Sequence, residues 1–185
     1  MITRQEYLDA VNYVMEQLER AKIVLTPHEY EKIEVADFGL GKIKITGLQL
    51  ITYVNTSRVC AKELILYPHQ TCPEHYHPSI ENELGKEETF RCRAGEVFLY
   101  IPGPSTQNPF CIPPQGDELY YTVFHEIHLR PGEQYTLPPD TKHWFQAGKE
   151  GAIISEFSTT SRDELDIFTD PRIKRKMMII DTPIK

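Results

Sequence analysis

The chain has 185 residues, of which 25% are charged and 40% hydrophobic, a composition typical of one globular domain. Its net charge of −7 argues against general nucleic-acid binding, because phosphates require a basic surface. No apolar run approaches the roughly 18 residues of a membrane span, and the N-terminus has no signal-peptide core. We therefore expect a cytoplasmic protein with no nucleic-acid or membrane partner.

Residues 1–41 are predicted to form a helical appendage. Thr3 and Glu6 make a capping-box pattern, and apolar side chains then recur at helical spacing. Thr26 and Glu29, with a proline between them, are start signals for a second, shorter helix. Because the apolar stripe of the first helix needs to be covered, we expect these segments to pack on a larger unit.

Residues 42–160 are predicted to form an antiparallel sandwich or barrel. Short β-rich runs alternate with turn signals such as Ala94-Gly95, Pro138-Pro139 and residues 148–151, and no helix of ordinary length fits between them. The predicted strands cover residues 48–54, 59–67, 89–93, 97–101, 121–129, 134–137, 143–146 and 152–157. Residues 161–185 are predicted to be a charged tail with a last apolar patch, Met177 to Ile180, which packs on the barrel or on a partner.

The strongest chemical signal lies in residues 73–77. Alternation along a strand places His75 and His77 on one face, where two imidazoles can bind one transition metal. A histidine pair alone is common on protein surfaces. Two later residues support a metal site: Glu88, which opens a predicted strand and precedes a glycine by seven positions, and His143, which lies just past a proline turn.

This arrangement resembles the two motifs of the cupin superfamily, G-(x5)-H-x-H-(x3–4)-E-(x6)-G and G-(x5)-P-x-G-(x2)-H-(x3)-N. The resemblance implies an all-β fold, a double-stranded β-helix or jelly-roll barrel with N-terminal helices. It also implies a metal inside the barrel with four ligands: His75, His77, Glu88 and His143. Glu81 stands at the ordinary spacing but lacks the later glycine, and Glu87 would face the opposite side of its strand; we prefer Glu88 to both.

Three neutral imidazoles and one carboxylate suit Mn²⁺, Fe²⁺, Co²⁺, Ni²⁺ or Zn²⁺, and ligand type alone does not select among them. Of these ions we expect Mn²⁺. An octahedral ion with four protein ligands keeps two adjacent positions for other atoms. Those positions suit two oxygens of one substrate, such as a carbonyl and the neighbouring hydroxyl.

The wider sequence resembles the compact bacterial D-lyxose isomerases, which are cupin-type aldose–ketose isomerases. The matching segments are residues 39–41 (GLG), 47–50 (GLQL), 60–64 (CAKEL), 70–75 (QTCPEH), 88–93 (ETFRCR), 143–148 (HWFQAG) and 166–173 (DIFTDPRI). The resemblance implies interconversion of D-lyxose and D-xylulose through a cis-enediol. This subgroup also resembles mannose-accepting enzymes, so the implied activity includes the interconversion of D-mannose and D-fructose.

Such a reaction needs acid–base groups close to the metal. Lys62 shares a strand face with Leu64 and Leu66; inside a barrel it would be desolvated, with a lowered pKa, and able to donate to a substrate oxyanion. Glu156 is an acid within an apolar strand. Surface ion pairing is the alternative for both. Our hypothesis is that Glu156 and Lys62 shuttle the proton.

Four further residues are candidate substrate contacts besides Lys62. Glu74 precedes a ligand and so points to the other face of the strand, and Trp144 either stacks on a sugar ring or lies in a core. Asp166 and Arg172 belong to a polar cluster with Asp170. That cluster either closes over the substrate or fixes the tail by ion pairs.

Other functions also fit these residues. An iron-dependent cupin dioxygenase would use the same ligands, and a cupin phosphosugar isomerase would need a cationic pocket, for which Lys86, Arg91 and Arg93 are candidates. A non-catalytic sensor would not need Lys62 and Glu156 near a metal. The two apolar segments outside the predicted barrel, one at each end of the chain, also predict a homodimer.

Overall fold

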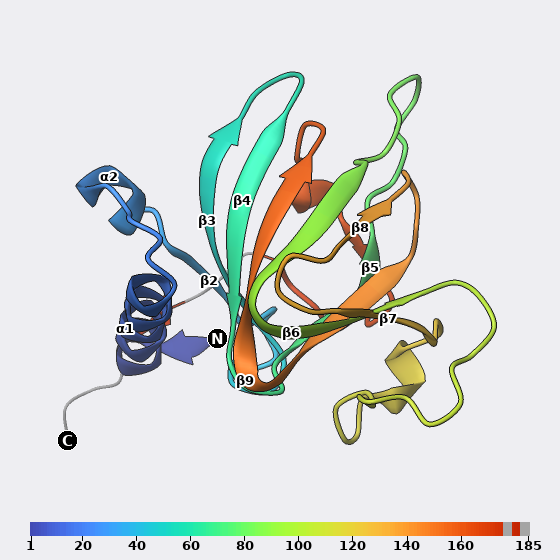
Figure 1. Cartoon of the computed structure of the whole chain (residues 1–185), viewed down its shortest axis with the longest axis horizontal. Helices are drawn as coiled ribbons and strands as arrows, with labels where there is room; N and C mark the ends of the chain where they lie inside the picture. The colour runs from blue at the N-terminus through green and yellow to red at the C-terminus, as the bar shows by residue number, and fades with distance from the viewer. Residues whose placement is uncertain (176–178, 182–185) are drawn as a thin grey trace.

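An antiparallel β-barrel forms the body of the molecule, with helix α1 (Arg4–Arg20) lying along its outside (Figure 1). The computed structural model describes residues 1–175 and 179–181. The other elements are β1 (Ile2–Thr3), α2 (Pro27–Tyr30), β2 (Glu34–Ala36), β3 (Leu48–Asn55), β4 (Cys60–Leu66), β5 (Thr71–Tyr76), β6 (Glu88–Ile101), η1 (Glu118–Tyr120), β7 (His125–Leu129), β8 (Gln134–Leu137), β9 (His143–Ser158), η2 (Asp163–Leu165), β10 (Ile167–Phe168) and β11 (Ile179–Ile180). Within the described ranges, no helix combines the length and the apolar character needed to cross a membrane.

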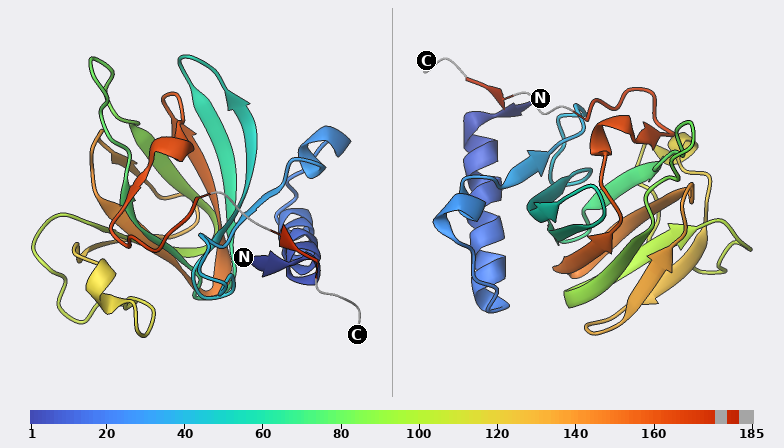
Figure 2. Two further views of the ribbon diagram at one scale, coloured as in Figure 1. Left: turned by 180° about the vertical axis from the view of Figure 1, so that it is seen from behind. Right: turned by 90° about the horizontal axis from the view of Figure 1, so that it is seen from above.

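Both predicted helix starts are confirmed. The Thr3 side chain accepts a hydrogen bond from the backbone of Glu6, and the Glu6 carboxylate accepts one from the backbone of Thr3. Thr26 and Glu29 form the same reciprocal pair at α2. The apolar stripe of α1 packs against side chains on the outer face of the barrel, such as Ile51, so the stripe is covered by this chain itself (Figure 2).

Two long strands, β6 and β9, form the centre of the barrel, although the sequence pattern predicted each of them as two separate strands. The glycine signals at residues 94–95 and 148–151 are bends within β6 and β9, where the pairing register shifts, rather than turns between separate strands. Bulges of this kind bend a strand while pairing continues. The first half of β9 therefore pairs with β5 and its second half with β4. The predicted strand over residues 121–129 is shorter than expected, because only His125–Leu129 is extended and paired.

Gly95 is the tightest point of this bend, with a φ of +71°. A Cβ at this position would lie 2.0 Å from the Gly151 carbonyl oxygen. We expect Gly95→Ala to lower the free energy of unfolding by about 3 kcal/mol, since it adds both backbone strain and overpacking. Gly116→Ala is the matched control, because its φ is +85° and nothing lies within 4 Å of an added Cβ. Thermal unfolding that showed equal losses in the two variants would refute this explanation.

Side chains alternate between the inside and the outside of the barrel, and this alternation decides which of the predicted site residues face the interior. On β4, Lys62 and Leu64 face the interior, whereas Ile65 packs under helix α1. After β9 the chain returns to the barrel, where β10 pairs with β5. Ile179 and Ile180 pair with β1, and the rest of the predicted terminal patch, Met177 and Met178, lies outside the described residues.

Candidate metal centre and active site

Three histidines meet inside the barrel. His75 lies on β5, His77 directly follows that strand, and His143 opens β9. Antiparallel pairing sets His75 opposite His143, which brings distant parts of the chain together. One ring nitrogen from each lies within 4.8 Å of the other two, and all three side chains are buried. The structure thus brings together the three histidines that the motifs predicted.

Hydrogen bonds fix the orientation of each ring. Nδ1 of His75 lies 2.8 Å from one backbone carbonyl oxygen, and Nδ1 of His143 lies 2.9 Å from another. Nδ1 of His77 bonds to the carboxylate of Asp166. Because these acceptors hold the Nδ1 proton, Nε2 of each ring is available as a metal ligand.

Glu88 lies beside two of these nitrogens. Its Oε1 is 3.0 Å from Nε2 of His77 and 3.1 Å from Nε2 of His143. Ligands that bind one ion at right angles, each about 2.1 Å from it, lie about 3 Å apart. The competing acids, Glu81 and Glu87, are both exposed.

The electrostatics of two of the three rings, His75 and His143, suit a cation. His77 differs: burial lowers its pKa, but Glu88 and Asp166 outweigh burial and raise that pKa to about 9, so a bound cation would displace the proton on its Nε2. Burial lowers the pKa of His143 to about 4, and burial followed by the neighbouring imidazoles lowers that of His75 well below its ordinary value, so both rings are neutral near pH 7. Nε2 of His143 is buried and makes no hydrogen bond. A buried polar atom without a partner costs about 1–3 kcal/mol, which a bound ion would recover. The donor set therefore fits a divalent first-row metal.

Glu88 also belongs to a chain of buried charges. Its Oε2 lies 2.8 Å from Nζ of Lys86, and the same ammonium lies 3.0 Å from Oε1 of Glu156. Burial would raise the pKa of Glu88, but Lys86 and then His77 lower it well below its usual range. Glu88 is therefore a carboxylate, as a metal ligand must be.

Lys62 faces the same cavity from the neighbouring strand. Its Nζ lies 3.8 Å from Oε1 of Glu156 and 2.7 Å from the carboxylate of Asp163. Burial lowers its pKa, as expected, but Glu156 and Asp163 outweigh both burial and Lys86. The prediction of a lowered pKa was wrong: the pKa of Lys62 is raised. Lys62 is therefore an ammonium that can donate a proton, not a base.

Residues 31–183 match the family model for D-lyxose isomerase. The chain belongs to the D-lyxose isomerase family. It is 62% identical over 175 residues to the D-lyxose/D-mannose isomerase of Thermosediminibacter oceani, covering 95% of this chain and 97% of that protein. It is also 62% identical over 174 residues to the D-lyxose ketol-isomerase of Cohnella laeviribosi, covering 94% of this chain and 96% of that protein.

The fold is shared with a second group of sugar isomerases. The structure of L-ribose isomerase from Acinetobacter sp. DL28 in complex with L-ribose superimposes with a TM-score of 0.81 at 17% identity. The match covers 97% of this chain and 98% of that one. The predicted all-β cupin barrel is confirmed, and the three clustered histidines lie inside it.

Two of the predicted substrate contacts lie on the outer side of the sheet. The carboxylate of Glu74 accepts hydrogen bonds from the backbone and hydroxyl of Thr122 and from the hydroxyl of Thr169. The indole of Trp144 stacks on Tyr100 at 3.9 Å between ring centroids and is fully buried outside the barrel. Both residues hold the chain that follows β6 and do not line the metal cavity.

The predicted polar cluster of the tail is divided. Arg172 pairs with Asp170 and Asp117 and does not line the cavity, so it fixes the tail to the loop before η1. Asp166 does line the cavity, but His77 engages its carboxylate. In this member of the D-lyxose isomerase family, the cluster thus orients the ring of His77 through Asp166 and anchors the tail through Arg172.

Lys86 and Asp163 are two of the charged cavity residues that sequence analysis missed. Lys86 was considered only as a phosphate ligand, although its spacing of two residues from Glu88 is a signal that both face inward. Asp163 carried no signal, because it follows the last long strand in a charged tail whose path depends on contacts with the barrel. Both residues contact Lys62, Glu88 or Glu156.

Proposed function

We propose that this chain is a cytoplasmic, metal-dependent aldose–ketose isomerase that interconverts D-lyxose and D-xylulose, and D-mannose and D-fructose. One observation supports the proposal most: His75, His77 and Glu88, whose side chains suit a metal, and a buried cluster of Lys62, Lys86 and Glu156 line one cavity. The 62% identity to relatives named as D-lyxose isomerases supports the same substrate class.

His75, His77, Glu88 and His143 would hold the metal, for which we propose Mn²⁺. When bound, such an ion supplies Lewis-acid polarisation of the aldose carbonyl and a template for two neighbouring oxygens. Asp166 keeps the ring of His77 in place through Nδ1. The protein thereby presents a fixed ligand set rather than one assembled around the ion.

Glu156 acts as the base in this proposal. Its carboxylate removes the proton from C2 of the open-chain aldose, which gives a cis-enediol, and returns that proton to C1. Lys62 gives a proton to O1 as the enediol forms and recovers one from O2 as C2 becomes the carbonyl. Lys86, at 3.0 Å, orients the Glu156 carboxylate. Acid–base groups must lie within hydrogen-bond reach of the reacting atoms, and a shared cavity provides that proximity.

The positions of the cations favour free sugars over phosphosugars. Lys86 is paired with Glu88 and Glu156. Arg91 donates to the side chain of Gln134, and Arg93 is exposed. The three cations that could have formed a phosphate pocket therefore do not converge.

A panel of sugars tests the proposed function. The protein is stripped with a chelator, reloaded with Mn²⁺ and incubated without oxygen with free and phosphorylated aldoses. We expect ketose from D-lyxose and D-mannose, and turnover of their phosphorylated counterparts at least about 100-fold slower, since a charged phosphate would be desolvated without a partner. Turnover of phosphosugars alone, or a requirement for oxygen, would reject the proposal in favour of one of the alternatives.

We also propose that the protein is a homodimer. The N-terminal stripe does not support this, because the barrel already covers it. Three other apolar side chains, Phe110, Ile112 and Leu119, are 73%, 71% and 93% exposed on the chain between β6 and β7. Clustered exposed apolar groups commonly mark contacts between subunits. Light scattering should give twice the chain mass, and a stable monomer would refute the dimer.

A further inference from the structure

Two cavities share one wall. Lys62, Asp163 and Arg175 line both the metal cavity and a second, more open cleft of about 620 Å³. The metal cavity itself measures about 40 Å³, which is space for roughly three water molecules. The metal cavity and the cleft meet at these three residues, so a sugar whose reacting end lies in the metal cavity can extend its other end past them into the cleft.

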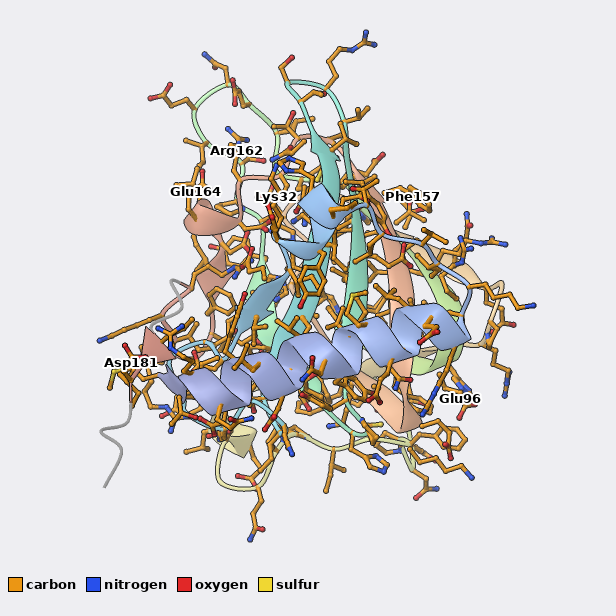
Figure 3. The ribbon with its side chains drawn as sticks, turned by 90° about the vertical axis from the view of Figure 1, so that its left-hand side faces the viewer. Lys32, Glu96, Phe157, Arg162, Glu164 and Asp181 are labelled. Atoms are coloured by element: carbon orange, nitrogen blue, oxygen red, sulfur yellow. The ribbon has the colours of Figure 1, made fainter. Side chains whose placement is uncertain are left out.

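Asp163 stands at the centre of this wall. Its carboxylate lies 2.7 Å from Nζ of Lys62 and 3.3 Å from the guanidinium of Arg175, and it accepts a hydrogen bond from the hydroxyl of Ser161. The residue belongs to η2, which follows β9 and lies outside the strands of the barrel. Figure 3 shows its neighbours Arg162 and Glu164 at this turn, above the left-hand end of helix α1 in that view.

The outer cleft has the chemistry of a hydroxyl-binding site. Its remaining lining is polar: Glu34, Thr52, Asn55, Ser161 and Glu164. Three of all its lining residues are acidic and two are basic, and the basic Arg175 and Lys62 are paired with Glu34 and Asp163. Carboxylates, amides and hydroxyls accept and donate hydrogen bonds to sugar hydroxyls. A terminal phosphate would meet a surplus of negative charge.

We propose that the outer cleft binds the distal carbons of an unphosphorylated open-chain aldose, and that Asp163 is a specificity-determining residue that limits the length of that chain. The inference rests on the proposed isomerase function. D-Lyxose and D-mannose share their configuration from C2 to C4 and differ by one carbon at the distal end. Selection between them must therefore occur where that end lies, beyond the wall that Asp163 forms.

Substitutions of Asp163 in both directions test this inference. Shortening the side chain in Asp163→Ala should raise the ratio of kcat/KM for D-mannose to that for D-lyxose by about tenfold, because one carbon in a fitted site is worth about that factor. Lengthening it in Asp163→Glu should lower the ratio. Asp163→Asn keeps the size and loses the charge, so it should slow both sugars while leaving the ratio unchanged.

A binding measurement and a control variant complete the experiment. Calorimetry gives the dissociation constants of D-mannitol and D-arabinitol, which the enzyme cannot turn over. In each Asp163 variant, the preference for D-mannitol over D-arabinitol should change in the same direction as the preference for D-mannose over D-lyxose. Glu118→Ala, which alters the first residue of the other short helical turn, η1, should change neither ratio. The inference would be overturned if Asp163→Ala and Asp163→Glu each changed kcat/KM for D-mannose and for D-lyxose by the same factor, which would leave the ratio unchanged. Absence of isomerisation in the unmodified protein would instead overturn the proposed function.

Discussion

His143→Ala is expected to abolish metal binding and to lower kcat by at least about 1,000-fold. The metal contributes several kcal/mol to the stabilisation of developing charge, and each 1.4 kcal/mol corresponds to about tenfold in rate. His143 is fully buried, its Nε2 has no hydrogen-bond partner, and its ring lies beside both other histidines. Its loss would leave the ion with two imidazoles and a carboxylate.

Metal content measured by elemental analysis checks this expectation. His28→Ala is the control, because His28 lies on the exposed helix α2 and should leave one ion per chain. An His143→Ala protein that keeps its ion with ordinary affinity would show that the metal is held elsewhere. A loss of activity with unchanged metal content would assign His143 to the sugar rather than to the ion.

Glu156→Gln is expected to lower kcat by about 100- to 10,000-fold while the metal is retained, the range that general acid–base groups contribute. Glutamine keeps the shape of the side chain but cannot accept the C2 proton. Glu156 contacts Lys86 at 3.0 Å and lies 3.8 Å from Lys62. The variant should therefore still fold and still bind sugar, but it should no longer exchange the C2 hydrogen with D₂O.

Glu63→Gln is the matched control for this experiment. Glu63 neighbours Lys62 on β4 but faces the outside, where it accepts hydrogen bonds from Ser155 and Tyr53. Burial raises the pKa of its carboxyl, so an uncharged amide should be tolerated there. We expect its activity to stay within about twofold. Full turnover by Glu156→Gln, with its metal present, would reject the base assignment.

Spacing predicted the histidines because the information is local. His75 lies on β5 and His77 directly follows it, and their spacing of two residues in extended chain sets them on one face. The preference for Glu88 over Glu81 also agrees with the structure, in which only Glu88 is buried. Strand periodicity predicted the histidine pair, whereas the glycine seven positions after Glu88 decided between the two acids.

The same local rules could not distinguish a bend from a turn. Gly95 and Gly151 both have positive φ, as turn glycines do, yet their strands continue through them because each lies against the other. That contact joins residues 56 positions apart and has no local signature. The glycines mark the bends that shape the barrel around the site.

Long-range charge pairs were also beyond sequence analysis. The pKa of Lys62 is raised because Glu156 lies beside it and because Asp163, 101 residues later, pairs with it. Trp144 directly follows a ligand, but strand alternation turns it outward onto Tyr100. Such outcomes depend on which distant segments pack together, and only the folded chain specifies them.

A crystal structure of the Mn²⁺-loaded protein with bound D-xylulose tests the central claim most directly. The account predicts one ion bound by His75, His77, Glu88 and His143, with C1 and C2 of the open-chain sugar beside the carboxylate of Glu156. An ion bound at other residues, or a sugar whose reacting carbons lie out of reach of Glu156, would contradict it.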